Sequence, residues 1–264
     1  MISECTHFPP SELVQIGAEN ILRIPNHVVI RTKNLIESPD NENMPLIKDD
    51  KLLKNSAIIL AGGPSSRLGQ DKGLLTLAGK PLIKHVLDAI GNLVDEKLVV
   101  VSSRTQAEDY SRVMSSKTRV VIDKGNGQTP LLGASTGLEA ANGEYSILLP
   151  CDTPFVSREV LSLLFDLRKN RAAVIPRWPN CYIEPLQAVY CTSPSLEAAK
   201  ASLSEGKPNM QSMVDKLHGI RYVSTLVLQQ LDPELRTFFN VNTPLDLKKA
   251  EAILGHQRSF TSKT

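Results

Sequence analysis

Residues 57–73 read AIILAGGPSSRLGQDKG, an apolar run that leads into a glycine-rich segment. Its first four residues are typical of a strand buried on both faces, because no polar residue alternates with them. Gly62 and Gly63 follow, and without a Cβ they let backbone N–H groups approach a ligand closely. Successive N–H groups in such a turn form a concavity for phosphate oxygens, and Arg67 and Lys72 add positive charge beside it. The stretch therefore predicts a strand followed by a cradle for a triphosphate.

Two better-known nucleotide loops do not fit this stretch. A dinucleotide fingerprint needs G-x-G-x-x-G, and a P-loop needs G-x-x-x-x-G-K-[ST]. The spacing from Gly63 to Gly69 is too long for the first, and Gly69 is followed by Gln70 rather than lysine. The glycines alone could be ordinary turn residues. Their joint spacing with Arg67, Asp71 and Lys72 after a buried strand favours the ligand-binding interpretation.

Short apolar runs recur along the chain and alternate with segments of helical periodicity. The predicted strands are residues 57–60, 97–102, 118–122, 145–150, 172–176 and 186–190. Helical spacing of apolar side chains predicts one helix at 81–93, with Pro81 in its first turn, and another at 157–169, with Ser157 as N-cap.

This alternation predicts the fold class. Strands separated by helices imply βαβ crossovers, hence an α/β fold with a doubly wound, mostly parallel sheet covered by helices on both faces. In such sheets ligands bind beyond the carboxyl ends of the strands. We therefore expect the chemistry in the loops that leave those ends.

The domain boundary is predicted in residues 37–50, ESPDNENMPLIKDD, which have the composition of an exposed linker. Residues 1–54 form an N-terminal extension, which we interpret as partly ordered rather than as a docking arm. Residues 55–254 form the main domain, and residues 255–264 form a C-terminal tail.

Composition narrows the class of partner. The 30 basic and 28 acidic residues give a formal net charge of only +2, which provides no strong field for nucleic acid or an anionic membrane surface. No apolar run approaches the roughly 18 residues of a membrane helix. The four cysteines lack the spacing of a zinc site or disulfide framework. We expect a cytoplasmic protein with reduced thiols and a small phosphorylated substrate.

Four motifs together carry a resemblance to a known family. They are LAGGPSSRLGQDKGLLTLAGKPLIKHV (60–86), CDTPF (151–155), EPLQAVY (184–190) and FFNVNTPLDL (238–247). In this order they resemble the molybdenum cofactor guanylyltransferases, nucleotidyltransferases with a Rossmann-like fold, over about residues 55–254. The resemblance implies transfer of GMP from GTP to the terminal phosphate of molybdopterin, with release of pyrophosphate. It also implies Mg²⁺ as cofactor and molybdoenzymes or their chaperones as further partners.

The resemblance assigns roles to particular residues. Asp152 would hold Mg²⁺ and act in catalysis with Arg67 and Lys72, although an isolated aspartate there could simply cap a turn. Asn240 and Asn242 would lie on the acceptor or metal side, or they could only shape the turn before a helix that Thr243 caps and Pro244 begins. The GTP contacts implied are Leu60, Ala61, Gly62, Gly63, Lys72, Ser102, Asp123 and Asp152.

Two of the implied nucleotide contacts, those of Asp123 and Ser102, are less strongly supported by the sequence. Asp123 could contact the nucleotide or form a turn. Ser102 stands where many relatives carry an asparagine that touches the nucleotide; it can still donate one hydrogen bond, and the resemblance then implies a weaker contact with the base. The resemblance links the glycine at position 62 with guanine, since related cytidylyltransferases tend to have alanine there.

The implied chemistry needs no general base. A phosphate monoester has a second pKa near 6, so the attacking phosphate is largely dianionic at neutral pH. The five histidines accordingly form no recognisable triad or dyad in the sequence. Two alternatives stay open: a related enzyme that uses CTP or another acceptor, such as cobinamide phosphate or a sugar phosphate, and a nucleotide-binding protein without catalysis.

Overall fold

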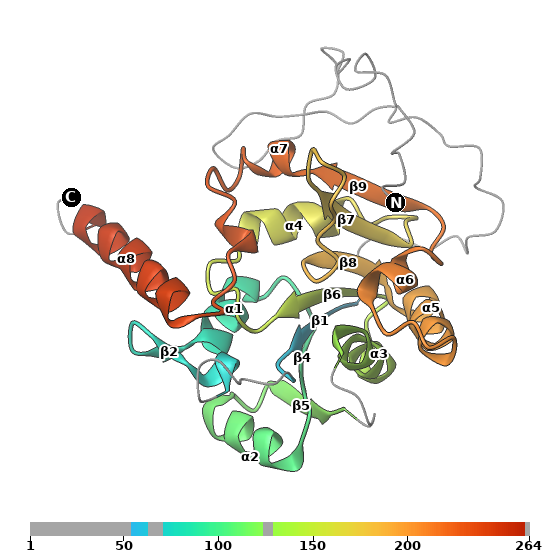
Figure 1. Ribbon diagram of the computed structural model, residues 1–264, viewed down its shortest axis with the longest axis horizontal. Coiled ribbons are helices and arrows are strands. Elements are labelled where there is room, and N and C mark those ends of the chain that lie inside the picture. Colours follow the sequence, from blue (N-terminus) through green and yellow to red (C-terminus); the bar gives the residue numbers. More distant parts are fainter. Residues whose placement is uncertain (1–53, 63–70, 124–128, 262–264) are drawn as a thin grey trace, which may run out of the picture. The chain divides into compact units, whose positions relative to one another are not determined.

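The computed structural model describes residues 54–62, 71–123 and 129–261 (Figure 1). Gly63 and Arg67, the extension up to residue 53 and the last three residues lie outside the described residues. No helix within the described ranges is long and apolar enough to cross a membrane.

A seven-stranded sheet forms the centre of the domain, in the order β5-β4-β1-β6-β8-β7-β9. All six strands predicted from the sequence are present. The strands are β1 (Asn55–Leu60), β4 (Glu96–Val101), β5 (Thr118–Ile122), β6 (Tyr145–Pro150), β7 (Ala173–Arg177), β8 (Ala188–Cys191) and β9 (Ile220–Ser224).

Strand direction places most carboxyl ends at one edge of the sheet. β1 pairs in parallel with β4 and β6, and β4 pairs in parallel with β5. β8 is antiparallel to both β6 and β7, so β6 and β7 run the same way, and β9 is parallel to β7. The prediction of a doubly wound, mostly parallel sheet is therefore confirmed, with β8 as the one reversed strand.

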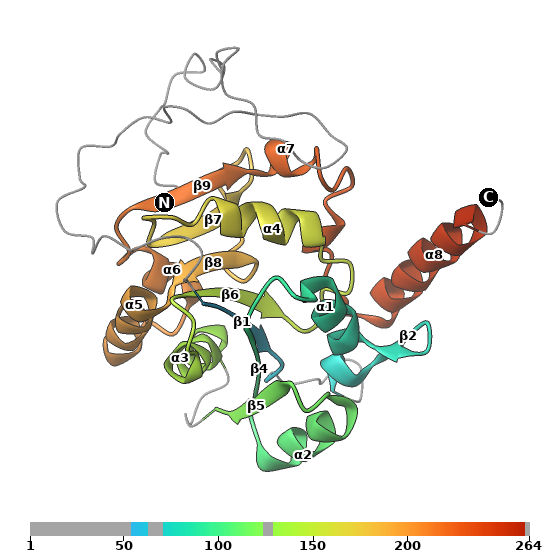
Figure 2. The ribbon, with the colours of Figure 1, turned by 180° about the vertical axis from the view of Figure 1, so that it is seen from behind.

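Helices cover both faces because side chains alternate along each strand. Ala57 and Ile59 of β1 belong to one buried cluster with α1 (Leu82–Ile90) and α4 (Arg158–Asp166). Ile58 belongs to a second cluster on the opposite face. That face is covered by α3 (Pro130–Ala140), α5 (Thr192–Ser204) and α6 (Met210–Val214), which lie together on one side in both views (Figures 1 and 2).

A smaller layer lies next to the main sheet. β2 (Thr76–Leu77) and β3 (Lys80–Pro81) form an antiparallel hairpin with a two-residue turn. Both turn residues, Ala78 and Gly79, have positive φ. Such a turn matches the twist of the strands that it joins. The hairpin and α8 (Pro244–Thr261) share a third buried cluster, and α8 lies beside β2 in both views.

Helix starts agree with the sequence in two of three cases. Ser157 caps α4 by accepting from the Val160 N–H, and Thr243 caps α8 by accepting from the Asp246 N–H. Pro81 was expected within the first helical turn. Instead it pairs with Thr76 in β3, and α1 begins at the next residue, because its ψ of 143° is outside the helical region. The remaining elements are α2 (Arg104–Val113), α7 (Thr225–Leu228), η2 (Lys72–Leu74) and η3 (Arg236–Phe238).

Candidate active site

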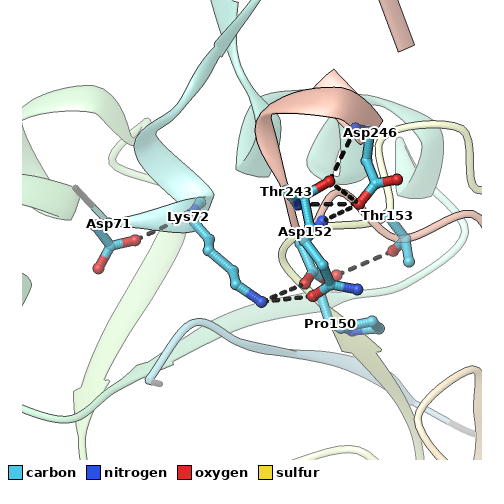
Figure 3. Close-up of polar contacts among 9 residues, drawn as sticks. Asp71, Lys72, Pro150, Asp152, Thr153, Thr243 and Asp246 are labelled. Atoms are coloured by element: carbon cyan, nitrogen blue, oxygen red, sulfur yellow. Dashed lines mark hydrogen bonds and ion pairs between the residues drawn. The ribbon is translucent and has the colours of Figure 1, made fainter. Parts of the chain in front are cut away.

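Lys72 is the point at which three of the sequence motifs meet. It is the first residue of η2, and its Nζ donates to Asn242 Oδ1 at 2.6 Å and to Asp152 Oδ2 at 3.4 Å. Figure 3 shows the lysine side chain extending from its turn toward Asp152. One ammonium group therefore joins the glycine-rich stretch, the CDTPF motif and the NVNTP motif.

The loop after β6 holds Asp152 by backbone bonds on two sides. Cys151 N–H donates to Leu60 O at 3.1 Å, which ties the loop to the end of β1. Val241 N–H donates to Asp152 O at 2.9 Å, which ties it to the segment before α8. Thr153 Oγ1 also donates to Pro150 O at 3.1 Å (Figure 3). Asp152 thus has a fixed backbone beyond the carboxyl end of β6, as predicted.

The environment of Asp152 favours a nearby cation. Its side chain is only 14% exposed, and burial raises the pKa of the carboxyl, while the charge and hydrogen bond of Lys72 oppose that rise. A buried carboxylate is costly unless a cation or hydrogen bonds compensate it. Lys72 supplies part of this compensation, at the long distance of 3.4 Å.

Asn242 is held by the start of α8. Asp246 Oδ2 accepts from the N–H groups of Asn242 and Thr243 and from the Thr243 hydroxyl, and these hydrogen bonds lower the pKa of the Asp246 carboxyl. The Asp246 N–H donates back to Thr243 Oγ1, which makes a reciprocal helix cap. The structure brings Asn242 to Lys72, whereas the side chain of Asn240 is exposed.

The predicted nucleotide side begins where β1 ends. Ala61 N–H donates to Val100 O at 2.8 Å, and Gly62 follows against the end of β4. A Cβ at Gly62 would lie 2.5 Å from Ser102 Oγ and 3.1 Å from Ser102 N. The absence of a side chain at position 62 therefore lets the two strand ends pack closely, independently of any ligand.

Asp123 lies at the same edge, directly after β5. Its N–H donates to Val101 O at 2.7 Å, so it is next to Ser102 across the sheet. Its Oδ1 accepts from Thr136 Oγ1 of α3 at 2.9 Å. Asp123 thus has a protein partner, and a contact with a nucleotide stays a prediction.

Two residues of α2 near the site were not predicted. Gln106 Nε2 donates to Asp71 Oδ2 at 2.5 Å, and the Tyr110 hydroxyl donates to Asp71 Oδ1. The sequence signal that could have indicated them is their spacing of four residues, which places two side chains on the same side of a helix. His85, by contrast, bonds a backbone oxygen, Leu77 O, at 3.0 Å, as expected for a structural histidine.

Comparison with known proteins places this geometry in a family. Residues 57–220, from β1 to the start of β9, match the model of the MobA-like NTP transferase domain. This chain belongs to the MobA-like NTP transferase family. The family resemblance seen in the sequence is thereby confirmed, and the MobA-like chain is an enzyme of the nucleotidyltransferase class.

Individual relatives agree with this membership. The MobA-like chain is 34% identical to a protein of Methanosarcina mazei named "Probable molybdenum cofactor guanylyltransferase", over 80% of this chain and 95% of the relative. It is 30% identical to the molybdenum cofactor guanylyltransferase of Desulfosudis oleivorans, over 75% and 95%. The crystal structure of molybdopterin-guanine dinucleotide biosynthesis protein A from Archaeoglobus fulgidus superposes with a TM-score of 0.65 at 29% identity, over 76% and 99%.

Proposed function

We propose that this enzyme transfers GMP from GTP to the terminal phosphate of molybdopterin and forms molybdopterin guanine dinucleotide. The observation that carries the proposal is the contact of Lys72 with both Asp152 and Asn242 at the carboxyl edge of the sheet. The names of the curated relatives support GTP and molybdopterin as the substrates.

The reaction is an in-line substitution at the α-phosphorus of GTP. An oxygen of the acceptor phosphate forms the new P–O bond, the bond to the β-phosphate oxygen breaks, and pyrophosphate leaves with the electron pair. The attacking phosphate is already largely dianionic at neutral pH, so no side chain has to remove a proton. The protein has to align two anions that repel each other and to offset the charge that develops on pyrophosphate.

Lys72 is suited to the second task. Its ammonium is held by a neutral amide oxygen and a more distant carboxylate, so it stays oriented toward the site. In our proposal it binds the triphosphate together with Arg67 and the amides of Gly62 and Gly63. Asn242, with Asn240 beside it in sequence, lies on the acceptor side.

Asp152 fits the role of a magnesium ligand. Its buried carboxylate and the Asn242 amide oxygen are hard donors within reach of the same ammonium, and Mg²⁺ prefers one or two carboxylates together with substrate phosphates. Among the residues that the structure describes, no three His, Cys, Asp or Glu side chains are grouped as a metal cage. When bound, Mg²⁺ neutralises charge on the phosphate oxygens.

Guanine selection is assigned to the segment Leu60 to Gly63, with Ser102 and Asp123 at the neighbouring strand ends. Because Gly62 has no Cβ, it packs directly against Ser102, which brings the Gly62 backbone close to a residue that we propose contacts the base.

The test is pyrophosphate release by the purified protein with Mg²⁺ and molybdopterin. We expect faster release from GTP than from CTP or ATP. Equal or faster use of CTP would overturn the guanine assignment. Turnover with cobinamide phosphate or a sugar 1-phosphate in place of molybdopterin would overturn the acceptor. No turnover with any nucleoside triphosphate would favour a binding protein without catalysis.

A further inference from the structure

The carboxylate of Asp71, the residue before Lys72, accepts hydrogen bonds from three groups of the protein. Its Oδ1 accepts from the Gly73 N–H at 3.0 Å and from the Tyr110 hydroxyl, and its Oδ2 accepts from Gln106 Nε2 at 2.5 Å. Three donors on one carboxylate fix its rotamer. Because Asp71 is the N-cap of η2, they also fix the turn on which Lys72 is the first residue.

The Tyr110 side chain packs against this turn. It is fully buried, and burial raises its pKa, so its hydroxyl stays protonated as a donor. A Cβ added at Gly73 would overlap with the Tyr110 hydroxyl and would lie 3.2 Å from Cys151 Cβ. The backbone of η2 therefore rests directly on the tyrosine.

Gln106 uses both ends of its amide. Its Oε1 accepts from the Ser102 N–H at 2.8 Å, while its Nε2 donates to Asp71. Ser102 is in turn the residue against which Gly62 packs. A single side chain thus connects the end of β4 with the turn that carries Lys72.

We propose that Gln106 and Tyr110 are positioning residues for catalysis: through Asp71 they fix the ammonium of Lys72 relative to the nucleotide-binding strand ends. This inference rests on the proposed function. A charge that acts in the transition state has to be held within a fraction of an ångström, and side chains behind the first layer provide that precision. Neither residue needs to touch substrate.

The first test removes the hydrogen bonds and keeps the volume. In Gln106→Leu and Tyr110→Phe we expect kcat for pyrophosphate release to fall about tenfold, with a smaller change in the KM for GTP, because hydrogen bonds to a charged group are the stronger ones. Glu108→Gln, at an exposed position of the same helix, is the matched control and should keep wild-type rates.

The second test separates positioning from a general loss of structure. In Gln106→Glu the introduced carboxylate faces that of Asp71, and only its protonated form can donate to Asp71 while accepting from Ser102. The activity of this variant, as a ratio to wild type, should therefore rise as the pH is lowered. Tyr110 and Cys151 also lie near Asp71, and Lys72, the ion-pair partner of Asp152, follows it in sequence; all four are present in both proteins, so the ratio isolates the introduced carboxylate.

A third measurement does not depend on turnover. Amide hydrogen exchange in residues 71–75 should be faster in Gln106→Leu than in wild type, while α4 is unchanged. Suppose that the wild-type enzyme turns over GTP. The positioning inference is overturned if the variants have the wild-type kcat, if the activity ratio does not change with pH and if their amide hydrogen exchange equals that of wild type. If wild type turns over no nucleotide, the proposed function fails, and the exchange rates alone decide whether Gln106 fixes the turn. Should Gln106→Leu fail to fold, Tyr110→Phe and Gln106→Glu decide the matter.

Discussion

The partners of Lys72 include a close neutral group and a more distant charged group. The Asn242 amide oxygen lies 2.6 Å from its Nζ and orients it, whereas the Asp152 carboxylate lies 3.4 Å away and compensates its charge only in part. The amide therefore orients the ammonium, and the carboxylate adds an opposite charge at a longer distance. In the proposed reaction the Lys72 ammonium would stabilise the oxygens that gain charge as pyrophosphate leaves, and Asp152 would hold the Mg²⁺ that neutralises charge on the phosphates.

Removing either charge should therefore slow the chemical step. We expect Lys72→Ala and Asp152→Ala each to lower kcat/KM by at least about tenfold, since each deletes an interaction needed mainly in the transition state. Steady-state pyrophosphate release measures the rate, and circular dichroism checks that the fold is intact. Wild-type rates in both variants would refute the site.

The two asparagines of the NVNTP motif should differ. Asn242→Ala removes the acceptor of the 2.6 Å bond from Lys72, so we expect about a tenfold fall in kcat/KM. Asn240→Ala alters an exposed side chain and serves as the matched control, with a smaller effect. A larger loss in the Asn240 variant would reverse the assignment.

At the scale of elements, α3 lies closer to the sheet at one of its two inner glycines than at the other. A Cβ at Gly137 would overlap with Ile58 Cγ2 and come within 3.2 Å of Val100 Cγ2. At Gly133 the nearest atom, Leu60 Cδ2, would be 3.5 Å away, an ordinary contact. The helix therefore approaches the sheet more closely at Gly137 than at Gly133.

This difference predicts opposite effects of the same substitution. Gly137→Ala should lower the free energy of unfolding by about 1–3 kcal/mol through overpacking. Gly133→Ala should leave it unchanged or raise it by up to about 1 kcal/mol, because alanine is the better helix former. Urea unfolding of both variants, followed by circular dichroism, provides the comparison. Equal effects would mean that the close approach at Gly137 is relaxed at little cost.

His85 links α1 to the β2–β3 hairpin and gives the fold a pH dependence. Its burial lowers the pKa of the imidazole, so below the usual value near 6.5 the unfolded chain binds a proton more readily than the folded chain. The contribution of His85 to stability is thus lost as the pH falls from 6.5 through the lowered pKa. Urea midpoints between pH 7 and pH 5 should fall less steeply in His85→Gln than in wild type. The exposed His218→Gln should keep the wild-type slope.

At the scale of the whole molecule, ligand binding should stabilise the folded state by mass action. GTP with Mg²⁺ at about 100 times Kd stabilises by about 2.7 kcal/mol. For a domain of this size that corresponds to a rise in Tm of roughly 5 to 10 °C. Thermal scans of wild type should show this shift with GTP, and the same GTP concentration should produce a smaller shift in Lys72→Ala, to the extent that Lys72 also binds the triphosphate in the ground state. Identical shifts in the two proteins would show that Lys72 adds nothing to the binding of GTP in the ground state.

Much of the fold could be predicted because the inner strands are continuous apolar runs. β9 was missed, since its sequence IRYVS is only partly buried at the sheet edge, and β2 and β3 are too short to show a period. The direction of β8 could not be predicted either, because an apolar run has the same composition in parallel and antiparallel pairing.

The candidate site was predicted unevenly. Lys72, Asp152 and Asn242 stand out in motifs that follow strands or precede a helix, so their convergence could be expected. Gln106 and Tyr110 belong to α2, of which Tyr110 is the only buried residue, so the helix lacks the apolar stripe that marks the others. Residues whose role is to hold another residue carry no composition signal of their own.

The contact between Gly62 and Ser102 constrains how this enzyme could evolve a different base preference. An alanine at position 62 would place its methyl group on the Ser102 hydroxyl and against the adjoining backbone. A smaller or re-oriented side chain at position 102 would relieve the 2.5 Å contact, whereas the 3.1 Å contact with the backbone nitrogen of Ser102 would remain. If residue 62 selects the base as proposed, the effect of a substitution there would depend on which residue already stands at position 102.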